Sequence, residues 1–199
     1  MNKVKNENRI IMLPVTIKRI FKKDYEGYPL PIEYTTDSYY DVSLSRTEDG
    51  WKADFSVARF PSPVTHTQEE FDYPDKLFQT HWKGAYAYGA FDGEKLIGAI
   101  ELYPEKWANR IRVTELWVGK NYRKQGLGKS LMEIAKAQAK KRGARMLILE
   151  TQSCNFNAVG FYLHEGFDLV GFLSCDYTNT DLTRKEVRLE MGWFNPYFR

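Results

Sequence analysis

Residues 115–132 constrain the fold more than any other part of the chain. An apolar strand pattern ends at Val118, a basic loop with two glycines follows, and apolar residues recur at helical spacing from Leu127. The unpaired N–H groups and partial positive charge of a helix start attract anions, most often a phosphate. Glycines at Gly126 and Gly128 allow the backbone to approach such a ligand closely. The segment therefore predicts a strand–loop–helix unit that binds phosphate.

Two familiar phosphate-binding motifs do not fit this loop. A P-loop needs a glycine five positions before Gly128, where the chain has Arg123. A dinucleotide-binding fingerprint needs a third glycine three positions after Gly128, where the chain has Leu131. The pattern that remains is Arg-x-x-Gly-x-Gly, from Arg123 to Gly128.

A second motif lies downstream of the predicted helix. Residues 145–151 form a short, mostly apolar pattern that is typical of a buried strand. They lead into residues 155–167, which read Asn-x-x-Ala-x-x-Phe-Tyr-x-x-x-Gly-Phe. In order and spacing, the two motifs resemble those of the GNAT superfamily of acetyl-CoA-dependent N-acetyltransferases. The resemblance is strong from Phe91 to Phe172, and the most similar branch is the streptothricin acetyltransferases.

The resemblance implies a single α+β domain over residues 1–199, with its cofactor-binding core at about residues 91–172. The expected fold is a GNAT-like mixed, largely antiparallel sheet that is flanked by helices and splayed at the acetyl-CoA site. Sequence patterns predict a helix from Leu127 to Gly143, a loop or short helix at 22–31, a short helix at 75–82, and loops at 61–74 and 176–185. Strands are predicted at 11–20, 39–46, 51–59, 86–91, 96–103, 110–118, 145–151, 167–174 and 186–194.

The resemblance also implies acetyl-CoA as the cosubstrate, with no metal. The strand backbone is expected to pair with the pantetheine arm, the loop N–H groups to hold the pyrophosphate, and the amide of Asn155 to contact pantetheine. The implied cofactor-binding residues are Leu116, Trp117, Val118, Arg123, Lys124, Gln125, Gly126, Leu127, Gly128, Lys129, Ser130, Asn155, Asn157 and Tyr162.

Acetyl transfer to an amine requires removal of a proton from the ammonium and a proton donor for the leaving thiolate. By resemblance, Tyr162 is the general acid, and a core aromatic is the alternative for this residue. Glu115 is the first candidate for the base, with Glu101 or an ordered water as alternatives. Strand alternation is expected to place Glu115 on the face of Val113 and Trp117.

Charge is distributed unevenly along the sequence. The formal net charge is +3, but residues 24–94 carry a balance of −9 and residues 95–150 a balance of +8. This asymmetry suits an enzyme that joins an anionic cofactor to a small cationic acceptor, although charged surfaces that serve only solubility would look the same. Streptothricin is the first candidate acceptor, and aminoglycoside, polyamine or protein N-acetylation are alternatives. Candidate acceptor contacts are Asp37, Tyr39, Tyr40, Asp41, Glu70, Phe71, Asp72, Tyr73 and Asp75.

Composition argues against several other classes of protein. Two cysteines and three scattered histidines do not suggest a disulfide framework or a zinc cluster. No apolar run is as long as a membrane span, and the first residues lack a signal-peptide pattern, so a cytoplasmic protein without a membrane partner is expected. The basic residues 120–145 would also fit a noncatalytic nucleic-acid-binding module, but the acidic half would repel a polyanion. No nucleic-acid partner is therefore expected, and a homodimer is left open.

Overall fold

The computed structural model describes residues 15–67 and 74–198. The first part of the strand predicted at 11–20 lies outside these residues, as do four acceptor candidates, Glu70, Phe71, Asp72 and Tyr73. No helix within the described ranges is long and apolar enough to cross a membrane.

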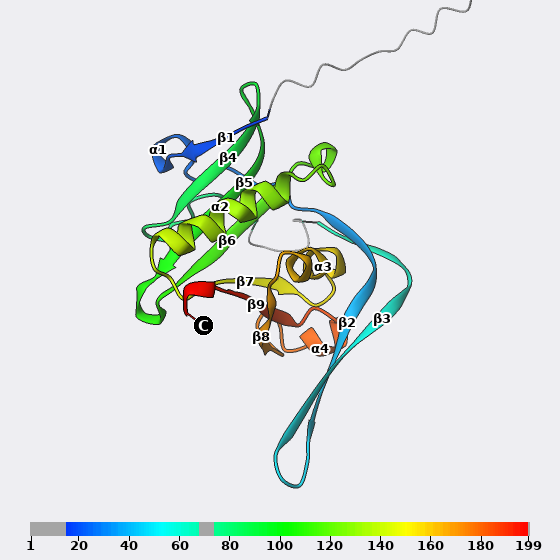
Figure 1. The fold of residues 1–199 in the computed structure, drawn as a ribbon. Coiled ribbons are helices and arrows are strands. Elements are labelled where there is room, and N and C mark those ends of the chain that lie inside the picture. The colour runs from blue at the N-terminus through cyan, green and yellow to red at the C-terminus, as the bar shows by residue number, and fades with distance from the viewer. Residues whose placement is uncertain (1–14, 68–73, 199) are drawn as a thin grey trace, which may run out of the picture.

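A seven-stranded sheet forms the centre of the molecule, with strand order β1-β4-β5-β6-β7-β9-β8 (Figure 1). Only the central pair, β6 and β7, is parallel, and the other neighbours are antiparallel. The predicted mixed, largely antiparallel α+β fold is thus confirmed. The strands are β1 (Thr16–Ile20), β4 (Tyr86–Asp92), β5 (Lys95–Glu105), β6 (Arg110–Val118), β7 (Met146–Gln152), β8 (Asp168–Leu173) and β9 (Arg188–Phe194).

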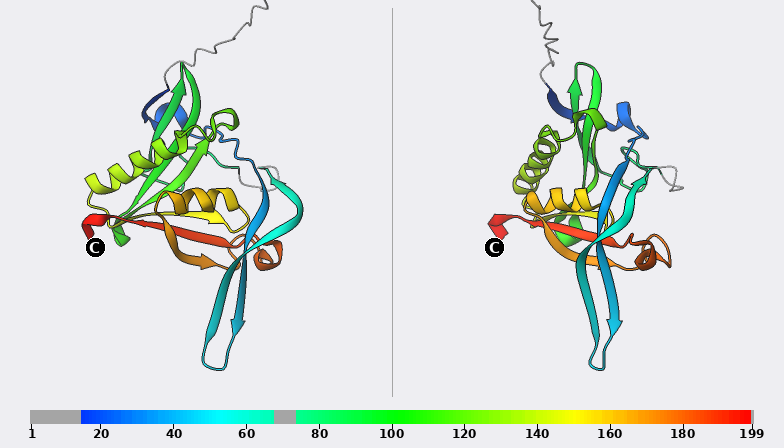
Figure 2. Two further views of the ribbon diagram at one scale, coloured as in Figure 1. Left: turned by 45° about the vertical axis from the view of Figure 1, so that its right-hand side comes forward. Right: turned by 90° about the vertical axis from the view of Figure 1, so that its right-hand side faces the viewer.

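Two longer helices cover one face of this sheet (Figures 1 and 2). α2 (Leu127–Lys141) follows β6 and buries an apolar stripe that includes Leu131 and Ala135. It ends before Gly143, which has φ +62°, a conformation that favours glycine and stops the helix as predicted. α3 (Phe156–His164) follows β7. The short elements are α1 (Lys22–Tyr25), α4 (Asp181–Arg184), η2 (Lys106–Ala108), η3 (Lys120–Tyr122) and η4 (Pro196–Phe198).

The core consists of two clusters on opposite faces of the sheet. Ile100 and Leu102 of β5 belong to the cluster that contains the α2 residue Leu131, whereas the adjacent strand position Ala99 belongs to the other cluster. The second cluster includes Leu30 and Leu77, from the segments before β2 and β4. These N-terminal segments therefore cover the face that α2 and α3 leave free.

A hairpin of β2 (Tyr34–Arg46) and β3 (Trp51–His66) forms a separate two-stranded sheet that projects from the body as an arm (Figures 1 and 2). Its near part is attached to α3, because the ring of Tyr40 stacks on Phe156 with centroids 5.3 Å apart. The predicted hairpin is confirmed, but both strands are longer than predicted.

Three sequence-based assignments were wrong. Residues 61–66, predicted as loop, belong to β3; the register shift leaves residues 60–63 without a cross-strand partner, so the prolines there interrupt no ladder. Residues 75–82 form turns instead of a helix, because Leu77 donates its backbone N–H to Tyr28 and Lys76 bridges to Pro29. The loop predicted at 176–185 contains α4.

Candidate active site

The parallel strands β6 and β7 pair only at their beginnings. The register joins residues 110–112 of β6 to residues 146–148 of β7 and stops there. On its other edge, β6 continues to pair with β5 as far as Val118. Among the described strands, none pairs with the β7-facing edge of β6 from Val113 to Val118. The predicted splay is present, and it leaves main-chain donors and acceptors available to an extended ligand.

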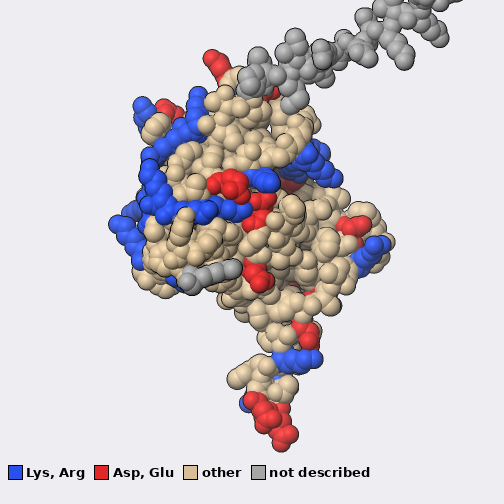
Figure 3. Space-filling model, viewed as in Figure 1, with Lys and Arg blue, Asp and Glu red and all other residues tan. Residues whose placement is uncertain are grey.

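The start of α2 is also open. Within the described ranges, the backbone N–H groups from Lys124 to Lys129 donate to no recorded acceptor, and the first helical bond runs from Ser130 N to Gly126 O at 3.0 Å. Gly126 has φ +84° and Lys124 has φ +60°, so the chain turns sharply into the helix. Figure 3 shows Lys and Arg side chains gathered over the α2 face of the molecule. Backbone donors and surrounding positive charge together make this helix start suitable for a phosphate group.

The side chains of the loop divide between structural and exposed roles. Arg123 donates from Nε to Val118 O at 3.0 Å and from Nη1 to Glu33 O at 2.9 Å, so its guanidinium fastens the loop to β6 and to the segment before β2. Lys124 and Lys129 are exposed. Among the basic residues predicted to bind the cofactor, these two lysines therefore direct their charge to solvent, whereas Arg123 does not. Three further side chains act locally: Gln125 Nε2 donates to Asn121 O, Ser130 Oγ donates to Gly126 O, and Leu127 is buried in the core.

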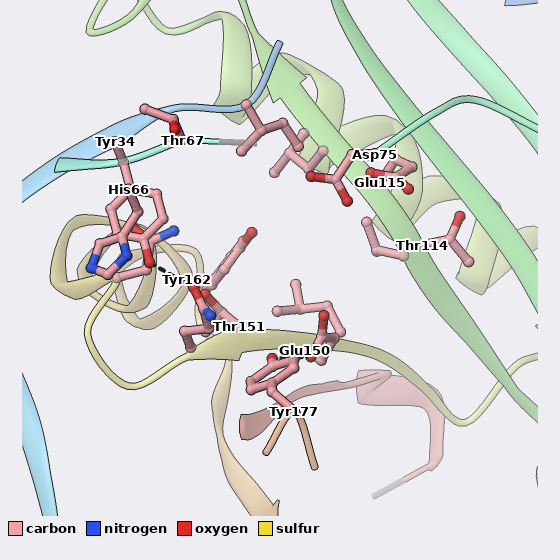
Figure 4. A pocket seen from close by; sticks show the side chains of 16 residues that line it. Tyr34, His66, Thr67, Asp75, Thr114, Glu115, Glu150, Thr151, Tyr162 and Tyr177 are labelled. Carbon is pink, nitrogen blue, oxygen red and sulfur yellow. Dashed lines mark hydrogen bonds between the residues drawn. The ribbon is translucent and has the colours of Figure 1, made fainter. Parts of the chain in front are cut away.

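A cavity of about 390 Å³ opens where β6 and β7 diverge (Figure 4). Its walls come from β6 and β7, from α3 and its N-cap, from the ends of β2 and β3, and from several loops. The lining residues are Ile32, Tyr34, His66, Thr67, Asp75, Val113, Thr114, Glu115, Leu116, Leu149, Glu150, Thr151, Gln152, Asn155, Tyr162 and Tyr177. Three carboxyl groups and three phenols in one cavity suit a cationic ligand that also needs proton transfer.

Glu115, the first candidate for the base, lines this cavity and is only 6% exposed. Its Oε1 accepts a hydrogen bond from Gln79 Nε2 at 3.2 Å. Burial raises the pKa of the Glu115 carboxyl well above its usual value, and the neighbouring carboxylates of Asp75 and Glu101 raise this pKa further. A carboxylate with a raised pKa is a stronger base than an ordinary one, which suits the role of a general base.

The expected alternation along β6 is wrong at one point. Leu102 pairs with Val113 and Glu101 with Glu115, so Thr114 is an extra residue that forms a bulge. Val113 consequently packs in the α2-side cluster, whereas Trp117 packs in the other one. Glu115 therefore shares a face with Trp117 but not with Val113.

Glu101, the alternative base, does not reach the cavity. Its side chain is 0% exposed and accepts hydrogen bonds from Phe78 N at 2.6 Å and from Thr114 Oγ1 at 2.9 Å. Burial raises the pKa of Glu101, while these two hydrogen bonds oppose the rise. The geometry favours Glu115 over Glu101 as the carboxylate that meets a ligand.

Tyr162 projects from α3 with its hydroxyl in the cavity (Figure 4). Its ring packs against Phe161 and Phe167, with centroids 5.4 Å and 5.9 Å away. Burial raises the pKa of the Tyr162 phenol, and the nearby charges of Glu150 and Glu115 raise it further. The hydroxyl therefore keeps its proton at neutral pH, as a proton donor must. The ring also packs against the hydrophobic core.

The two asparagines of the second motif have different positions. Asn155 lines the cavity and caps α3, because its Oδ1 accepts a hydrogen bond from Ala158 N at 3.3 Å. Asn157 lies outside the cavity lining and donates from Nδ2 to Thr35 O at 3.3 Å, which joins α3 to β2. Trp117 likewise turns its side chain away, donating from Nε1 to Pro31 O at 3.3 Å, so only its backbone belongs to the open strand edge.

Of the described acceptor candidates, Asp75 alone lines the cavity. Asp41 is paired with Lys185 at 2.7 Å, and Asp37 is exposed, so the structure does not bring these acids to the site. The rings of Tyr39 and Tyr40 pack instead on Phe60 and Phe156.

Sequence reasoning missed Glu150 and Tyr177 on the β7 side. Tyr177 donates its hydroxyl to Glu150 Oε2 at 2.6 Å, and Arg188 Nε lies 3.4 Å from the same oxygen. Glu150 could have been found, because it stands near the carboxyl end of a parallel strand, where such sheets bind ligands. Tyr177 comes from an irregular segment, and no pattern pointed to it.

The chain belongs to the acetyltransferase (GNAT) family, whose model matches residues 49–167. The predicted enzyme class, an acetyltransferase, is thereby confirmed at the level of the family. The chain is 28% identical to streptothricin acetyltransferase A of Bacillus subtilis (strain 168) over 125 residues, which cover 63% of this chain and 70% of that protein. It is 34% identical to the streptothricin acetyltransferase of Streptomyces lavendulae over 94 residues, or 47% of this chain and 49% of that protein.

Solved structures confirm the fold. The crystal structure of nourseothricin acetyltransferase superimposes with a TM-score of 0.71 at 24% identity, covering 92% of this chain and 99% of that one. A structure from Bacillus anthracis str. Ames in complex with acetyl coenzyme A gives a TM-score of 0.68 at 24% identity, covering 92% of this chain and 98% of that one.

Proposed function

We propose that this protein transfers an acetyl group from acetyl-CoA to an amino group of a small cationic acceptor, with streptothricin as the first candidate. The observation that carries the proposal is the cavity between β6 and β7. The open edge of β6, the Glu115 carboxyl and the Tyr162 hydroxyl all meet there.

The described main chain fits an extended cosubstrate with a pyrophosphate group. The unpaired edge of β6 from Val113 to Val118 offers the donors and acceptors that a pantetheine arm would use as an added strand. The N–H groups from Lys124 to Lys129 offer donors to the pyrophosphate, and the charges of Lys124 and Lys129 add to the attraction. Bound acetyl-CoA would supply the thioester, whose carbonyl carbon accepts the amine.

Two side chains then perform the proton transfers. Glu115 takes a proton from the acceptor's ammonium, which frees the nitrogen lone pair for attack on the thioester. Tyr162 donates its phenolic proton to the sulfur as the carbon–sulfur bond breaks, and its phenolate recovers the second nitrogen proton as the amide forms. The raised pKa values of both groups suit these directions, because Glu115 is a stronger base than an ordinary carboxylate and Tyr162 stays protonated until it is needed.

The acceptor is assigned from charge and from similarity. Asp75, Glu115 and Glu150 give the cavity an acidic lining, which favours an ammonium group over a neutral or anionic nucleophile. Streptothricin carries a β-lysine arm with such groups. Two similar proteins are named for this substrate, at 28% and 34% identity over parts of their length.

The test uses the purified chain with acetyl-CoA and a panel of amines. We expect release of CoA with streptothricin and an added acetyl group on the drug by mass spectrometry, together with resistance when the gene is expressed in a susceptible bacterium. The Tyr162→Phe variant is the matched control for enzyme-dependent transfer. Acetylation of an aminoglycoside, a polyamine or a peptide in place of streptothricin would reassign the acceptor, and no binding of acetyl-CoA at all would overturn the proposal.

A further inference from the structure

Asp75 stands on a segment that the backbone holds firmly against the cavity. Its carbonyl accepts a hydrogen bond from Leu30 N at 2.9 Å. Two residues further on, Leu77 donates to Tyr28 O at 2.9 Å and accepts from Gly27 N at 2.9 Å. These contacts on both sides of Lys76 fix the main chain, so the Asp75 carboxyl is presented to the cavity from a rigid support (Figure 4).

The carboxyl groups of Asp75 and Glu115 both line this cavity, and the charge of Asp75 acts on Glu115 (Figure 4). Within the described ranges, no hydrogen bond or ion pair is recorded for the Asp75 side chain, and Glu115 has the single bond from Gln79 to Oε1. Glu115 is 6% exposed, and its Oε2 has no recorded donor among the described residues. Asp75 is half-buried, but both carboxyl groups line one cavity and can accept hydrogen bonds from the same donor group.

The surrounding charges do not neutralise the pair. The charge of Glu101 on β5 raises the pKa of Glu115, and the charge of Glu150 on β7 raises the pKa of both Asp75 and Glu115. The nearest recorded cation on the β7 side, Arg188, is engaged by Glu150, Asp176 and Glu190. Among the described residues, the other titratable groups that line the cavity are the phenols of Tyr34, Tyr162 and Tyr177, and the imidazole of His66.

We propose that Asp75 and Glu115 together form the receptor for the acceptor's ammonium group, and that binding of this cation displaces a proton from the pair. This inference rests on the proposed function and specifies how that site recognises its substrate. The ammonium donates to both carboxylates, and the displaced proton leaves to solvent. Glu115 then accepts one proton from the bound ammonium, while Asp75 keeps its negative charge and retains the substrate.

The ionisation order of the two groups agrees with this division. Burial, with a further contribution from Glu150, raises the pKa of Asp75 to about 6. The pKa of Glu115 is raised well above its usual value by burial, and then by the charge of Asp75. The charge of Asp75 therefore opposes ionisation of Glu115, and the pair titrates in two coupled steps.

The first experiment needs no acceptor. The carboxyl resonances of Asp75 and Glu115 are followed by carbon-13 NMR as a function of pH, in the wild type and in Asp75→Asn. We expect the pKa of Glu115 to fall in Asp75→Asn, because the neighbouring charge is gone. Asp54→Asn removes the same charge from the projecting hairpin, where Asp54 pairs with Lys52 at 2.9 Å, and should leave that pKa unchanged. An unchanged Glu115 titration in Asp75→Asn would overturn the pairing.

The second experiment measures proton release directly. Streptothricin is titrated into the protein with CoA, which cannot transfer an acetyl group, in buffers of different ionisation enthalpy at pH 7. We expect the wild type to release protons when the cation binds and Asp75→Asn to release far fewer. Binding without proton release would overturn the displacement of a proton while leaving the proposed function intact. Failure of streptothricin to bind would instead contradict the proposed acceptor, and the NMR titration would still decide the pairing.

Steady-state kinetics separate the two roles. Asp75→Asn should raise KM for the acceptor about 10- to 100-fold with kcat within about threefold, because a charged hydrogen bond made in both ground and transition states is lost. Glu115→Gln should lower kcat by about 100-fold, because it removes the proton acceptor. Equal effects of both variants on kcat alone would assign Asp75 to support of Glu115 instead of to the substrate.

Discussion

The two sides of the cavity are built in different ways. The cofactor side, defined by the open edge of β6 and residues 119–130, is a continuous stretch of sequence that offers mainly backbone groups. The acceptor side, defined by Tyr34, Asp75, Glu115, Glu150 and Tyr177, draws side chains from separate segments. Recognition by backbone groups depends on the conformation of the main chain, so it should fail when a glycine that this conformation requires is replaced. Side-chain recognition depends on individual charges, so it should fail one group at a time.

The largest effect is expected from the loop glycines. Valine at Gly126 would be strained at φ +84°, and together with valine at Gly128 it should displace the open N–H groups that we propose bind the phosphate. Acetyl-CoA at 100 times its Kd should stabilise the wild type by about 2.7 kcal/mol, and this shift should vanish in the double variant. Thermal unfolding with and without acetyl-CoA measures it.

A matched control separates loss of binding from backbone strain. Gly84 has φ +97° and open space around its Cβ position, but it lies outside the cofactor side. Gly84→Val should lower the melting temperature and keep the full shift with acetyl-CoA. A full shift in the Gly126→Val, Gly128→Val protein would show that this loop does not bind the cofactor.

The next effect concerns the proton donor. Tyr162→Phe keeps the ring that packs on Phe161 and Phe167 and removes only the hydroxyl. We expect kcat to fall by about 100-fold, with the melting temperature and the shift caused by acetyl-CoA preserved. The rate should be measured under conditions where chemistry limits turnover. If kcat there equals that of the wild type, Tyr162 is a packing residue only.

The strand and the helix of the cofactor side could be predicted because their signals are contiguous. The bounds predicted for β6 agree with the structure, and α2 begins at Leu127 as its apolar spacing indicates. Glycine positions and helical periodicity are local properties, so a single sequence reveals them. The sequence did not show that Asn157 would bond to β2 instead of facing the cavity, because that contact joins residues far apart in the chain.

The acceptor side was predicted less well for the same physical reason. The acids of residues 24–94 were counted together, but Asp41 pairs with Lys185 and only Asp75 among the described candidates lines the cavity. The bulge at Thr114 reversed part of the expected alternation, and a bulge leaves no clear trace in residue type. Long-range backbone bonds from Leu30 and Leu77 replaced a predicted helix at 75–82.

A smaller effect is expected from pH. Acidification should protonate Asp75, whose pKa is raised to about 6, and so weaken binding of a cation that stays fully protonated. kcat/KM for the acceptor should therefore fall at least about tenfold between pH 7 and pH 5. Asp75→Asn should lose most of this dependence near pH 6. If the wild type and the variant have identical pH profiles, Asp75 does not carry the recognition charge.

Salt should produce a change of a few fold. Complementary charge between an acidic cavity and a cationic acceptor raises the association rate, and ions screen it. We expect kcat/KM with the acceptor to fall roughly three- to tenfold as ionic strength rises from about 0.05 to 0.5 M. Glu150→Gln should reduce this dependence, and Asp54→Asn on the projecting hairpin should not. A salt effect that is equal in all three proteins would point to the cofactor side as its source.

The smallest expected effect is on the free energy of unfolding. Its sign should differ between Asp75, which lines the cavity, and Asp41, which forms an ion pair. The folded-state pKa of Asp75 is raised from 3.8 to about 6, so its protonation-linked stability is present below the unfolded value and is lost as pH rises through 6. At pH 8 the wild type holds an ionised Asp75 beside other carboxyl groups. Asp75→Asn should therefore stabilise the protein by about 1 kcal/mol, or a melting temperature higher by roughly 2–4 °C.

The same substitution at a paired acid should act in the opposite direction. Asp41 forms an ion pair with Lys185 at 2.7 Å, and Asp41→Asn removes that contact, so it should lower stability by about 0–1 kcal/mol at pH 8. Near pH 4 the gain from Asp75→Asn should disappear, because Asp75 is already protonated there. Calorimetric scans of both variants at the two pH values measure these differences. A destabilised Asp75→Asn protein at pH 8 would mean that this carboxylate has a stabilising partner in the free enzyme, and the acceptor side would then be no different from the rest of the surface.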